Sequence, residues 1–392
     1  MLLWTIAYPA SYPGISILTI GTDESVSNPL IICNSTAITL NTLAVLLTRR
    51  NNKIMIKGIW IESGSGLRAR ILNYGAVLNR LIVPSRSEII EAVLYYVNDH
   101  DYLSDQTFLG AVVGPWSNRI RNGMYRHRRH RIQLDCNEQG MHHLHGGKNG
   151  LYRQFWEFVE VSERAVTLAC HHPAELSGYP GDLDVEVRYE FTADDVLQAS
   201  VTATVSEAMP VSVTFHPYFN LNSEAGSNIL NHRLMIASCG VWEADAESIP
   251  VLLNSPESSV FDLRCPRLVG EVVEQSQDGS SPLAATAGGL DHCWMITSGR
   301  PSARPRRAAA ISSEQSRLLL EVWTDQPAVQ CYTGQYLDPC SVVAGGAPGQ
   351  FGGMCIEPEL VPDQPNLPGL PSAILSPGQQ YTHQTLYRLI QQ

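Results

Sequence analysis

The feature that most constrains the fold of this chain is a run of nine residues in which apolar and polar side chains alternate without a fault. In LDVEVRYEF the apolar positions are Leu183, Val185, Val187, Tyr189 and Phe191. Because successive side chains of a strand point to opposite faces of a sheet, this period predicts a strand with one buried and one solvated face. The run LQASVTATV at 197–205 repeats the pattern after a turn at 193–196, so we expect the two strands to pair antiparallel.

The same kind of pattern extends over most of the chain. Further strands are predicted at 166–171, 317–324 and 328–333, and residues 66–84 predict a hairpin that turns at Tyr74 and Gly75. No window of twelve residues has a persuasive helical period with caps. Loops are predicted at 301–316 and 338–353 from their Arg, Ala, Ser and Gly content. The fold class is therefore all-β, with the sheets closed into one large antiparallel sandwich or barrel-like body.

The first 57 residues share no periodicity with the rest, so we predict an extension at 1–57 and a single domain at 58–392. Residues 29–53 are apolar with a basic flank, as a membrane anchor would be. Polar residues interrupt that stretch, namely Asn34, Ser35, Thr36, Asn41 and Thr42. No basic start with a small-residue cleavage site precedes it. A poorly ordered extension is expected, with an anchor or signal as the alternative.

Charge and cysteine usage exclude several classes of function. The formal charge of −11 and the pI near 5.5 argue against a nucleic-acid or anionic-membrane partner, since either would require a basic face. The nine cysteines are scattered singly without a CxxC motif, which indicates neither a disulfide framework nor a thiolate zinc site. A reducing compartment, the cytoplasm, and a neutral or cationic small ligand are expected.

A histidine lies at the end of a predicted strand in AMPVSVTFHPYFNLN, residues 208–222. Val211, Val213 and Phe215 are expected in the core, whereas His216 belongs to the polar set. Pro217 lacks a backbone donor, so the strand should end just after the histidine. His216 is therefore placed where its ring can titrate, although a ring that only hydrogen-bonds a loop remains the alternative.

A carboxylate has a similar position in GGMCIEPELVPDQPN, residues 352–366. Glu357 is predicted on the opposite face of a short strand from Ile356, and Pro358 is expected to end that strand. A carboxylate at a strand end beside apolar residues is a candidate general base. Glu359 and Asp363 follow in the same stretch and are expected to be solvated.

Three other stretches contain polar residues that core packing does not need. Asn118 and Arg119 lie between glycine-bearing turns and are suited to grip ligand hydroxyls, with a structural salt bridge as the alternative for Arg119. His145 precedes two glycines in MHHLHGGKNG, where backbone can come close. Clustered histidines could instead hold a metal, but no third ligand of fixed spacing is apparent, so no metal site is expected. Asp291 follows a glycine pair and is a candidate ligand-binding residue or a turn aspartate.

These stretches together resemble the aldose 1-epimerase, or galactose mutarotase, family from about Ser63 to Leu389. The pieces that carry the resemblance occur in the family's order and are NYGAVLNRLIVP, GPWSNRIRNG, HHLHGGKNG, SGYPGDLDVEVRYEF, FHPYFNL, GGLDHCW, TDQPAVQCYTGQYL, CIEPELVPDQPN and LSPGQQYTHQTLYRL. The resemblance implies a β-sandwich of the galactose-mutarotase type and interconversion of the α and β anomers of free aldoses. It also implies no cofactor and a free monosaccharide as substrate.

The resemblance further implies a role for each candidate residue. Glu357 would be the base on the C1 hydroxyl, His216 the acid at the ring oxygen, and His145 an assisting group. The residues that would hold sugar hydroxyls are Asn118, Arg119, Asp291 and Gln330. From their reference pKa values, Glu357 is expected to be ionised at neutral pH and His216 to be kept partly protonated by its surroundings.

The chain departs from the family pattern at Pro115, at Pro217 and just after Glu357, which bears on sugar preference more than on chemistry. The alternatives are a sugar-binding or regulatory protein without turnover, a hexose-6-phosphate epimerase, and a glycoside hydrolase using Asp291 and Glu357 as its two carboxylates.

Overall fold

The computed structural model describes residues 55–85, 89–222, 226–257, 259–277, 288–297, 299–338 and 349–392, together with the backbone of two short strands before them. The chain divides into two compact units, Met1–Met55 and Ile56–Gln392. In the first unit, β1 (Ile15–Leu18) pairs antiparallel with β2 (Leu30–Cys33). Apart from β2, the apolar stretch at 29–53 lies outside the described residues. No helix among those residues is long and apolar enough to cross a membrane.

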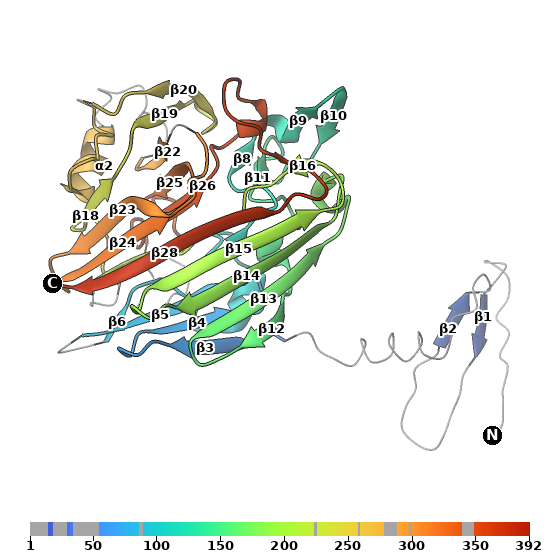
Figure 1. Cartoon of the computed structure of the whole chain (residues 1–392), viewed down its shortest axis with the longest axis horizontal. Helices are drawn as coiled ribbons and strands as arrows, with labels where there is room; N and C mark the ends of the chain where they lie inside the picture. Colours follow the sequence, from blue (N-terminus) through green and yellow to red (C-terminus); the bar gives the residue numbers. More distant parts are fainter. Residues whose placement is uncertain are drawn as a thin grey trace, which may run out of the picture. The chain divides into compact units, whose positions relative to one another are not determined.

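The second unit is built around a nine-stranded antiparallel sheet. In spatial order its strands are β12 (Glu157–Val161), β13 (Ala165–His172), β14 (Leu183–Phe191), β15 (Leu197–Val205), β28 (Tyr381–Gln391), β24 (Leu318–Thr324), β23 (Arg306–Ser313), β18 (Arg233–Ile236) and β21 (Arg267–Leu268). In Figure 1 the strands β13, β14, β15 and β28 run as a broad, twisted layer across the body. This sheet supplies much of the core.

Two smaller sheets complete the sandwich. The five-stranded sheet has the order β20 (Pro250–Asn254), β19 (Gly240–Ala244), β22 (Asp291–Met295), β25 (Ala328–Tyr332) and β26 (Cys355–Glu359). The four-stranded sheet has the order β3 (Gly58–Glu62), β4 (Arg68–Leu72), β5 (Leu78–Pro84) and β6 (Ile89–Glu91). The strand β26 lies at one edge of its sheet.

Short strand pairs and helical turns connect these sheets. The pairs are β7 (Val112–Val113) with β17 (Thr214–Phe215), β8 (Arg119–Ile120) with β11 (His143–Leu144), β9 (Met124–His127) with β10 (His130–Gln133), and β16 (Met209–Pro210) with β27 (Ile374–Leu375). The described α-helix is α2 (Val269–Gln277), and 3-10 helices cover Asp99–Leu103, Arg121–Gly123, Leu151–Arg153, Leu176–Gly178 and Gln364–Asn366.

The alternating runs form the strands that the sequence predicts. Along β14 every apolar position is buried, while Asp184 and Glu186 are exposed. Its partner β15 pairs with it antiparallel, from Leu183 opposite Val205 to Phe191 opposite Leu197. The all-β class and the antiparallel sandwich are therefore confirmed.

Two elements differ from the expectation. The stretch 301–316, predicted as a loop, contains the strand β23, because pairing with β24 and β18 and the burial of Ala308, Ala309 and Ile311 outweigh its weak β-propensity. The helix α2 was not predicted, since it has only nine residues and is rich in β-branched valine. Its buried residues Val269, Val272, Val273 and Ser276 do have helical spacing. The predicted loop at 338–353 lies largely outside the described residues.

We predict that deletion of residues 1–55 leaves the unit from Ile56 onward folded. The strands β3 to β28 pair among themselves, Ile56 packs against a hydrophobic cluster of that unit, and the Lys57 backbone N–H donates to the Asn73 side chain at 2.6 Å. The truncated protein should therefore have a melting temperature within a few degrees of the full chain. Differential scanning calorimetry of both proteins would check this, and a truncated protein without a cooperative transition would contradict it.

Candidate active site

Three of the candidate residues lie on neighbouring strands of the five-stranded sheet. Gln330 on β25 lies directly opposite Glu357 on β26, and Asp291 begins the adjoining strand β22. The Gln330 side-chain N–H donates to Asp291 Oδ1 at 2.7 Å. Strand pairing thus brings together residues that are up to 66 positions apart in the sequence, from Asp291 to Glu357.

The strand that carries Glu357 is longer than predicted. Pro358 does not end β26, which continues to Glu359, because β26 is an edge strand where a residue without a backbone donor is tolerated. The expectation that Glu359 and Asp363 are solvated is also wrong. Glu359 is 0% exposed and Asp363 is 2% exposed. A second carboxyl therefore lies buried two residues beyond the candidate base.

His216 follows the two-residue strand β17, which pairs with β7 and lies against β26. The Thr214 hydroxyl donates to the carbonyl of Pro358 at 2.6 Å and so ties β17 to the strand that carries Glu357. His216 Nε2 consequently lies 3.6 Å from Glu357 Oε2, and both side chains are almost fully buried. The sequence analysis placed each residue at a strand end; His216 does follow the end of β17, whereas Glu357 lies in the middle of β26.

His145 is held by a reciprocal pair of hydrogen bonds with Asn118. The Asn118 backbone N–H donates to His145 Nδ1 at 3.0 Å, and the His145 backbone N–H donates to the Asn118 carbonyl at 3.1 Å. Both residues have positive φ angles, 60° for Asn118 and 51° for His145. Residues other than glycine rarely adopt such angles. Since Nδ1 accepts a hydrogen bond, a neutral His145 ring carries its proton on Nε2.

The glycine after His145 is required by a close approach of two backbone segments. A Cβ added at Gly146 would lie only 1.8 Å from the carbonyl oxygen of Gly114. No side chain can be accommodated there. The close approach that the sequence predicts for this glycine pair is present.

The neighbouring histidines do not join this site. His143 Nδ1 donates to the Asp135 carbonyl at 2.9 Å, and its Nε2 is hydrogen-bonded to the Tyr179 hydroxyl at 2.8 Å. His142 accepts from the Asn122 backbone N–H at 3.0 Å. Of the three clustered histidines, His145 alone lines the candidate cavity. The other two are structural.

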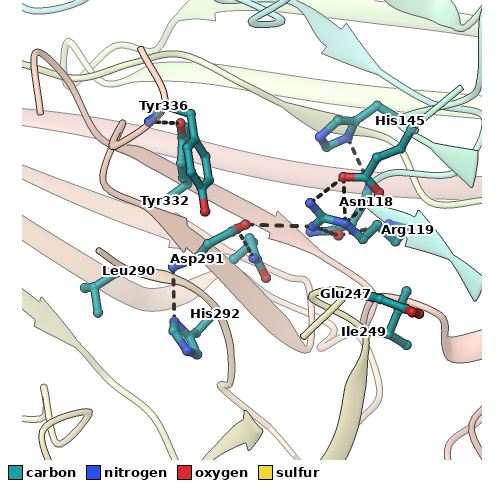
Figure 2. A network of polar contacts seen from close by, with 12 residues as sticks. Asn118, Arg119, His145, Glu247, Ile249, Leu290, Asp291, His292, Tyr332 and Tyr336 are labelled. Atoms are coloured by element: carbon teal, nitrogen blue, oxygen red, sulfur yellow. Dashed lines mark hydrogen bonds and ion pairs between the residues drawn. The ribbon is translucent and has the colours of Figure 1, made fainter. Parts of the chain in front are cut away.

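Arg119 has two carboxylate neighbours. Its guanidinium donates to Glu138 at 2.7 Å and 2.9 Å, and its Nη1 lies 3.9 Å from Asp291 Oδ2. For Arg119 the sequence analysis gave a structural salt bridge as the alternative to ligand binding, and that salt bridge is present. Figure 2 shows the guanidinium beside Asn118 on one side and joined to Asp291 on the other. Asp291 is held by Gln330 and Arg119, so it does more than cap a turn.

A cavity of about 220 Å³ joins the candidate residues. Its lining includes all seven of them, which are Asn118, Arg119, His145, His216, Asp291, Gln330 and Glu357. It also includes residues that the sequence analysis missed, mainly Gln106, Thr107, Phe108, Glu138, Tyr218, Tyr332 and Tyr336. Tyr332 could have been found from its position on the predicted strand at 328–333, whereas no sequence signal marks Phe108.

Aromatic rings surround the two imidazoles. The Phe108 ring centroid lies 4.6 Å from that of His145 and 5.8 Å from that of His216. The Tyr218 ring is 5.1 Å from His216, and the two imidazoles lie edge to face at 5.3 Å. These contacts fix the ring positions and keep water from the imidazole faces.

Burial reverses the protonation that the sequence analysis expected. It lowers the pKa of His216 to about 4, and together with the nearby His216 it lowers the pKa of His145 well below its usual value. Burial, with Glu359 and Asp291 as further causes, raises the pKa of Glu357 well above its usual value. Charged forms are disfavoured away from water. Burial therefore favours a protonated Glu357 and neutral imidazoles at His216 and His145.

The three central groups could also coordinate a metal ion. His145, His216 and Glu357 each offer one ligand atom, and these atoms lie within 4.8 Å of one another. Two imidazoles and one carboxylate form a donor set suited to zinc and similar ions. The metal alternative that the sequence raised for the clustered histidines thus falls on His145 with two residues from other strands.

The arrangement is suited to proton transfer on a neutral polar ligand. Two buried titratable groups, His216 and Glu357, lie 3.6 Å apart, and amide, guanidinium and carboxylate groups lie around them. A ligand bound between these groups could give a proton to one and take a proton from the other.

Comparison with known proteins gives a consistent result. Residues 58–388 match the family model described as aldose 1-epimerase. The chain is 30% identical to aldose 1-epimerase of Escherichia coli K12 over 356 residues, covering 88% of this chain and 95% of that protein. It is 31% identical to galactose mutarotase of the mouse over 325 residues, covering 82% and 91% of the two chains. The crystal structure of a GalM/aldose epimerase homologue from C. elegans aligns with a TM-score of 0.77 at 26% identity, covering 86% and 99%.

Proposed function

The chain belongs to the aldose 1-epimerase family, and from that premise we propose that it interconverts the α and β anomers of free aldoses. The substrate class is a free monosaccharide such as glucose or galactose. The alternatives of a sugar-binding protein without turnover and of a hexose-6-phosphate epimerase are not favoured by the relatives that the chain matches.

The observation that carries the proposal is the pair formed by His216 and Glu357. Anomer exchange requires that a proton leaves the C1 hydroxyl while the ring oxygen gains one. The C1–C2 bond then rotates, and the ring closes on the other face of the aldehyde. One acid and one base suffice for these steps. A titratable nitrogen and oxygen 3.6 Å apart in a cavity of about 220 Å³ supply both.

We assign Glu357 as the base on the C1 hydroxyl and His216 as the acid at the ring oxygen. Burial favours the uncharged arrangement of this pair when the cavity is empty. A bound sugar favours the charged arrangement, because its C1 hydroxyl donates to the carboxylate and its ring oxygen accepts from the imidazolium. The proton passes from Glu357 to His216 as the sugar binds, and the reverse transfers occur when the ring closes.

The remaining residues position the sugar. His145, neutral with its proton on Nε2, is a hydrogen-bond donor for a sugar oxygen. Asp291 accepts a hydrogen bond from Gln330 and lies 3.9 Å from Arg119, and all three residues line the cavity. Their remaining donors and acceptors would bind sugar hydroxyls. The Asn118 side chain is largely occupied by Arg119 and Glu359, so it acts mainly by holding its neighbours in place.

We propose a cytoplasmic location on the chemistry of the cysteines. The cysteines within the described ranges, among them the exposed Cys239 and Cys265, are free thiols. Such thiols persist in a reducing compartment.

Replacement of Glu357 by Gln should reduce kcat by about 10² or more while the sugar still binds, because general-base assistance acts in the transition state. The substitution His216→Asn should have a similar effect. The double variant should be little worse than either single one, since acid and base act in one step. The rate is measured by polarimetry with freshly dissolved α-glucose and α-galactose. Asp363→Asn, a buried carboxyl outside the cavity lining, is the control and should keep a near-normal rate.

If Glu357→Gln keeps more than about a tenth of the wild-type kcat, the assignment of the base is wrong. No acceleration of mutarotation by the wild-type protein with any aldose would refute the proposed function itself.

The substitution Arg119→Ala should act mainly on binding and raise KM by about tenfold or more, the effect of losing one hydrogen bond to a charged group. Arg121→Ala is the matched control, because Arg121 pairs with Asp245 outside the cavity lining and should keep the wild-type KM. Initial rates over a range of sugar concentrations separate KM from kcat. A large fall in kcat with unchanged KM would show that Arg119 serves the chemistry instead.

Removal of metal ions should leave the rate unchanged, because acid–base ring opening transfers only protons. Added Zn²⁺ should inhibit, since its candidate ligands His145, His216 and Glu357 are the reacting groups themselves. Polarimetric rates after dialysis against EDTA, and with zinc chloride added, would measure both effects. A loss of activity on dialysis that zinc restores would argue for a metal-dependent reaction.

A further inference from the structure

We propose that Glu138 determines the substrate specificity of the site. It fixes the guanidinium of Arg119 and offsets its positive charge, so that the cavity accepts neutral sugars and disfavours acidic ones. Glu138 is not one of the groups that transfer protons, and the sequence analysis did not identify it. The inference rests on the proposed function, because it concerns which aldoses that reaction accepts.

Hydrogen bonds of its own turn place Glu138 beside Arg119. Arg119 lies opposite Leu144 in the pairing of β8 with β11. Asn137 is bonded twice to that same Leu144, since its Oδ1 accepts from the backbone N–H at 2.7 Å and its Nδ2 donates to the carbonyl at 2.9 Å. The next residue is Glu138, whose backbone N–H donates to the His142 carbonyl at 3.1 Å. The turn that carries Glu138 is therefore tied to the strand pair that carries Arg119.

The two side chains form a bidentate ion pair. Arg119 Nε donates to Glu138 Oε2 at 2.9 Å and lies 3.1 Å from Oε1, and Nη2 donates to Oε1 at 2.7 Å. The side chains of Arg119 and Glu138 are only 13% and 19% exposed. Two parallel bonds of this kind fix the plane of a guanidinium as well as its position. Glu138 is thus a positioning residue for Arg119.

This ion pair leaves the Nη1 end of Arg119 for a ligand. Nη1 lies 3.5 Å from Asn118 Oδ1 and 3.9 Å from Asp291 Oδ2, the two contacts drawn in Figure 2. Both distances are long for a hydrogen bond to a guanidinium. The N–H groups of Nη1 can therefore donate to a sugar hydroxyl.

The same contacts offset the charge of Arg119. Among the described residues that line the cavity, Arg119 is the one permanent cation, whereas Glu138, Asp291 and Glu357 carry carboxyl groups. Glu138 and Asp291 approach Arg119 at different nitrogens. No cation of that lining is left to pair with an acid group on a ligand. A carboxylate or phosphate would be removed from water without a partner, which is costly, so the site discriminates by repulsion as well as by attraction.

Cations of an adjoining cavity do not change this balance. Lys148 and Arg153 line that cavity, which has a volume of about 310 Å³, and both residues are exposed. The same lining contains the carboxylates of Asp105 and Glu138. Exposed cations remain solvated and gain little from an ion pair. Glu138 borders both cavities, so an acid group in either one would meet its charge.

The test compares galactose with galacturonate in wild type and in Glu138→Gln. Glutamine keeps the size of the side chain and removes its charge. KM for galactose should rise by about threefold to tenfold, because Arg119 is no longer held. The ratio of kcat/KM for galacturonate to that for galactose should rise by about tenfold or more, the effect of one charged hydrogen bond released for the ligand. Glu138→Ala should change the ratio in the same direction. Rates are measured by polarimetry at neutral pH, where the carboxyl of galacturonate is ionised.

Glu91→Gln is the matched control. Glu91 accepts from Nε and Nη2 of Arg80, as Glu138 does from Arg119, but it lies outside the cavity lining, so KM and the ratio should keep their wild-type values. Glu138→Asp retains the charge and should retain the wild-type ratio, whatever its effect on KM. The double variant Arg119→Ala/Glu138→Gln should have the same KM for galactose as Arg119→Ala, because Glu138 acts through Arg119.

An unchanged ratio in Glu138→Gln would overturn the inference, as would an equal change in Glu138→Asp or Glu91→Gln. A double variant with a much higher KM than Arg119→Ala would show that Glu138 does not act through Arg119. Calorimetric titration of the same proteins with both sugars measures Kd without turnover and should show the same change of preference. A wild-type protein that binds galactose without turnover would refute the proposed function, and the titration would still decide the role of Glu138. Binding of neither sugar would refute both.

Discussion

The burial of His216 beside Glu357 is the interaction on which the rest of the site depends. In water the two groups would be an ordinary imidazole and carboxylate that titrate independently. In the protein the charged forms of both groups are disfavoured by burial, and His216 Nε2 lies 3.6 Å from Glu357 Oε2. The aromatic wall of Phe108 and Tyr218 maintains this condition, because it keeps water from the imidazole of His216.

The strands explain how such a pair can be held with precision. Gln330 and Glu357 are fixed by the register of β25 and β26, and His216 is fixed by the bond from Thr214 to the Pro358 carbonyl. Each reacting group therefore sits on or directly after a strand that is buried on both sides. Groups held in this way lose little further freedom when a ligand binds, which favours catalysis over mere binding.

Much of this could be predicted from the sequence, and the failures have identifiable physical causes. The strands β14 and β15 could be predicted from alternation alone, because each has one buried face and one face closer to solvent. The strand β23 does not, since its alanines gain their burial only from neighbouring strands. His216 was found because Pro217 marks the end of its strand, whereas Glu357 was found beside a proline that does not end β26. The raised pKa of Glu357 and the burial of Glu359 were missed. Both result from the packing of distant parts of the chain against β26, which the local sequence does not show.

The left-handed backbone of Asn118 and His145 has a consequence for how this protein can change over time. Each such conformation costs on the order of 1 kcal/mol, less for asparagine than for most residues, and the rest of the fold must offset it. Glycine at position 145 would relieve the strain but would lose the imidazole. Selection for thermal stability alone would therefore erode this site, and the persistence of a histidine there across related sequences would report selection for activity.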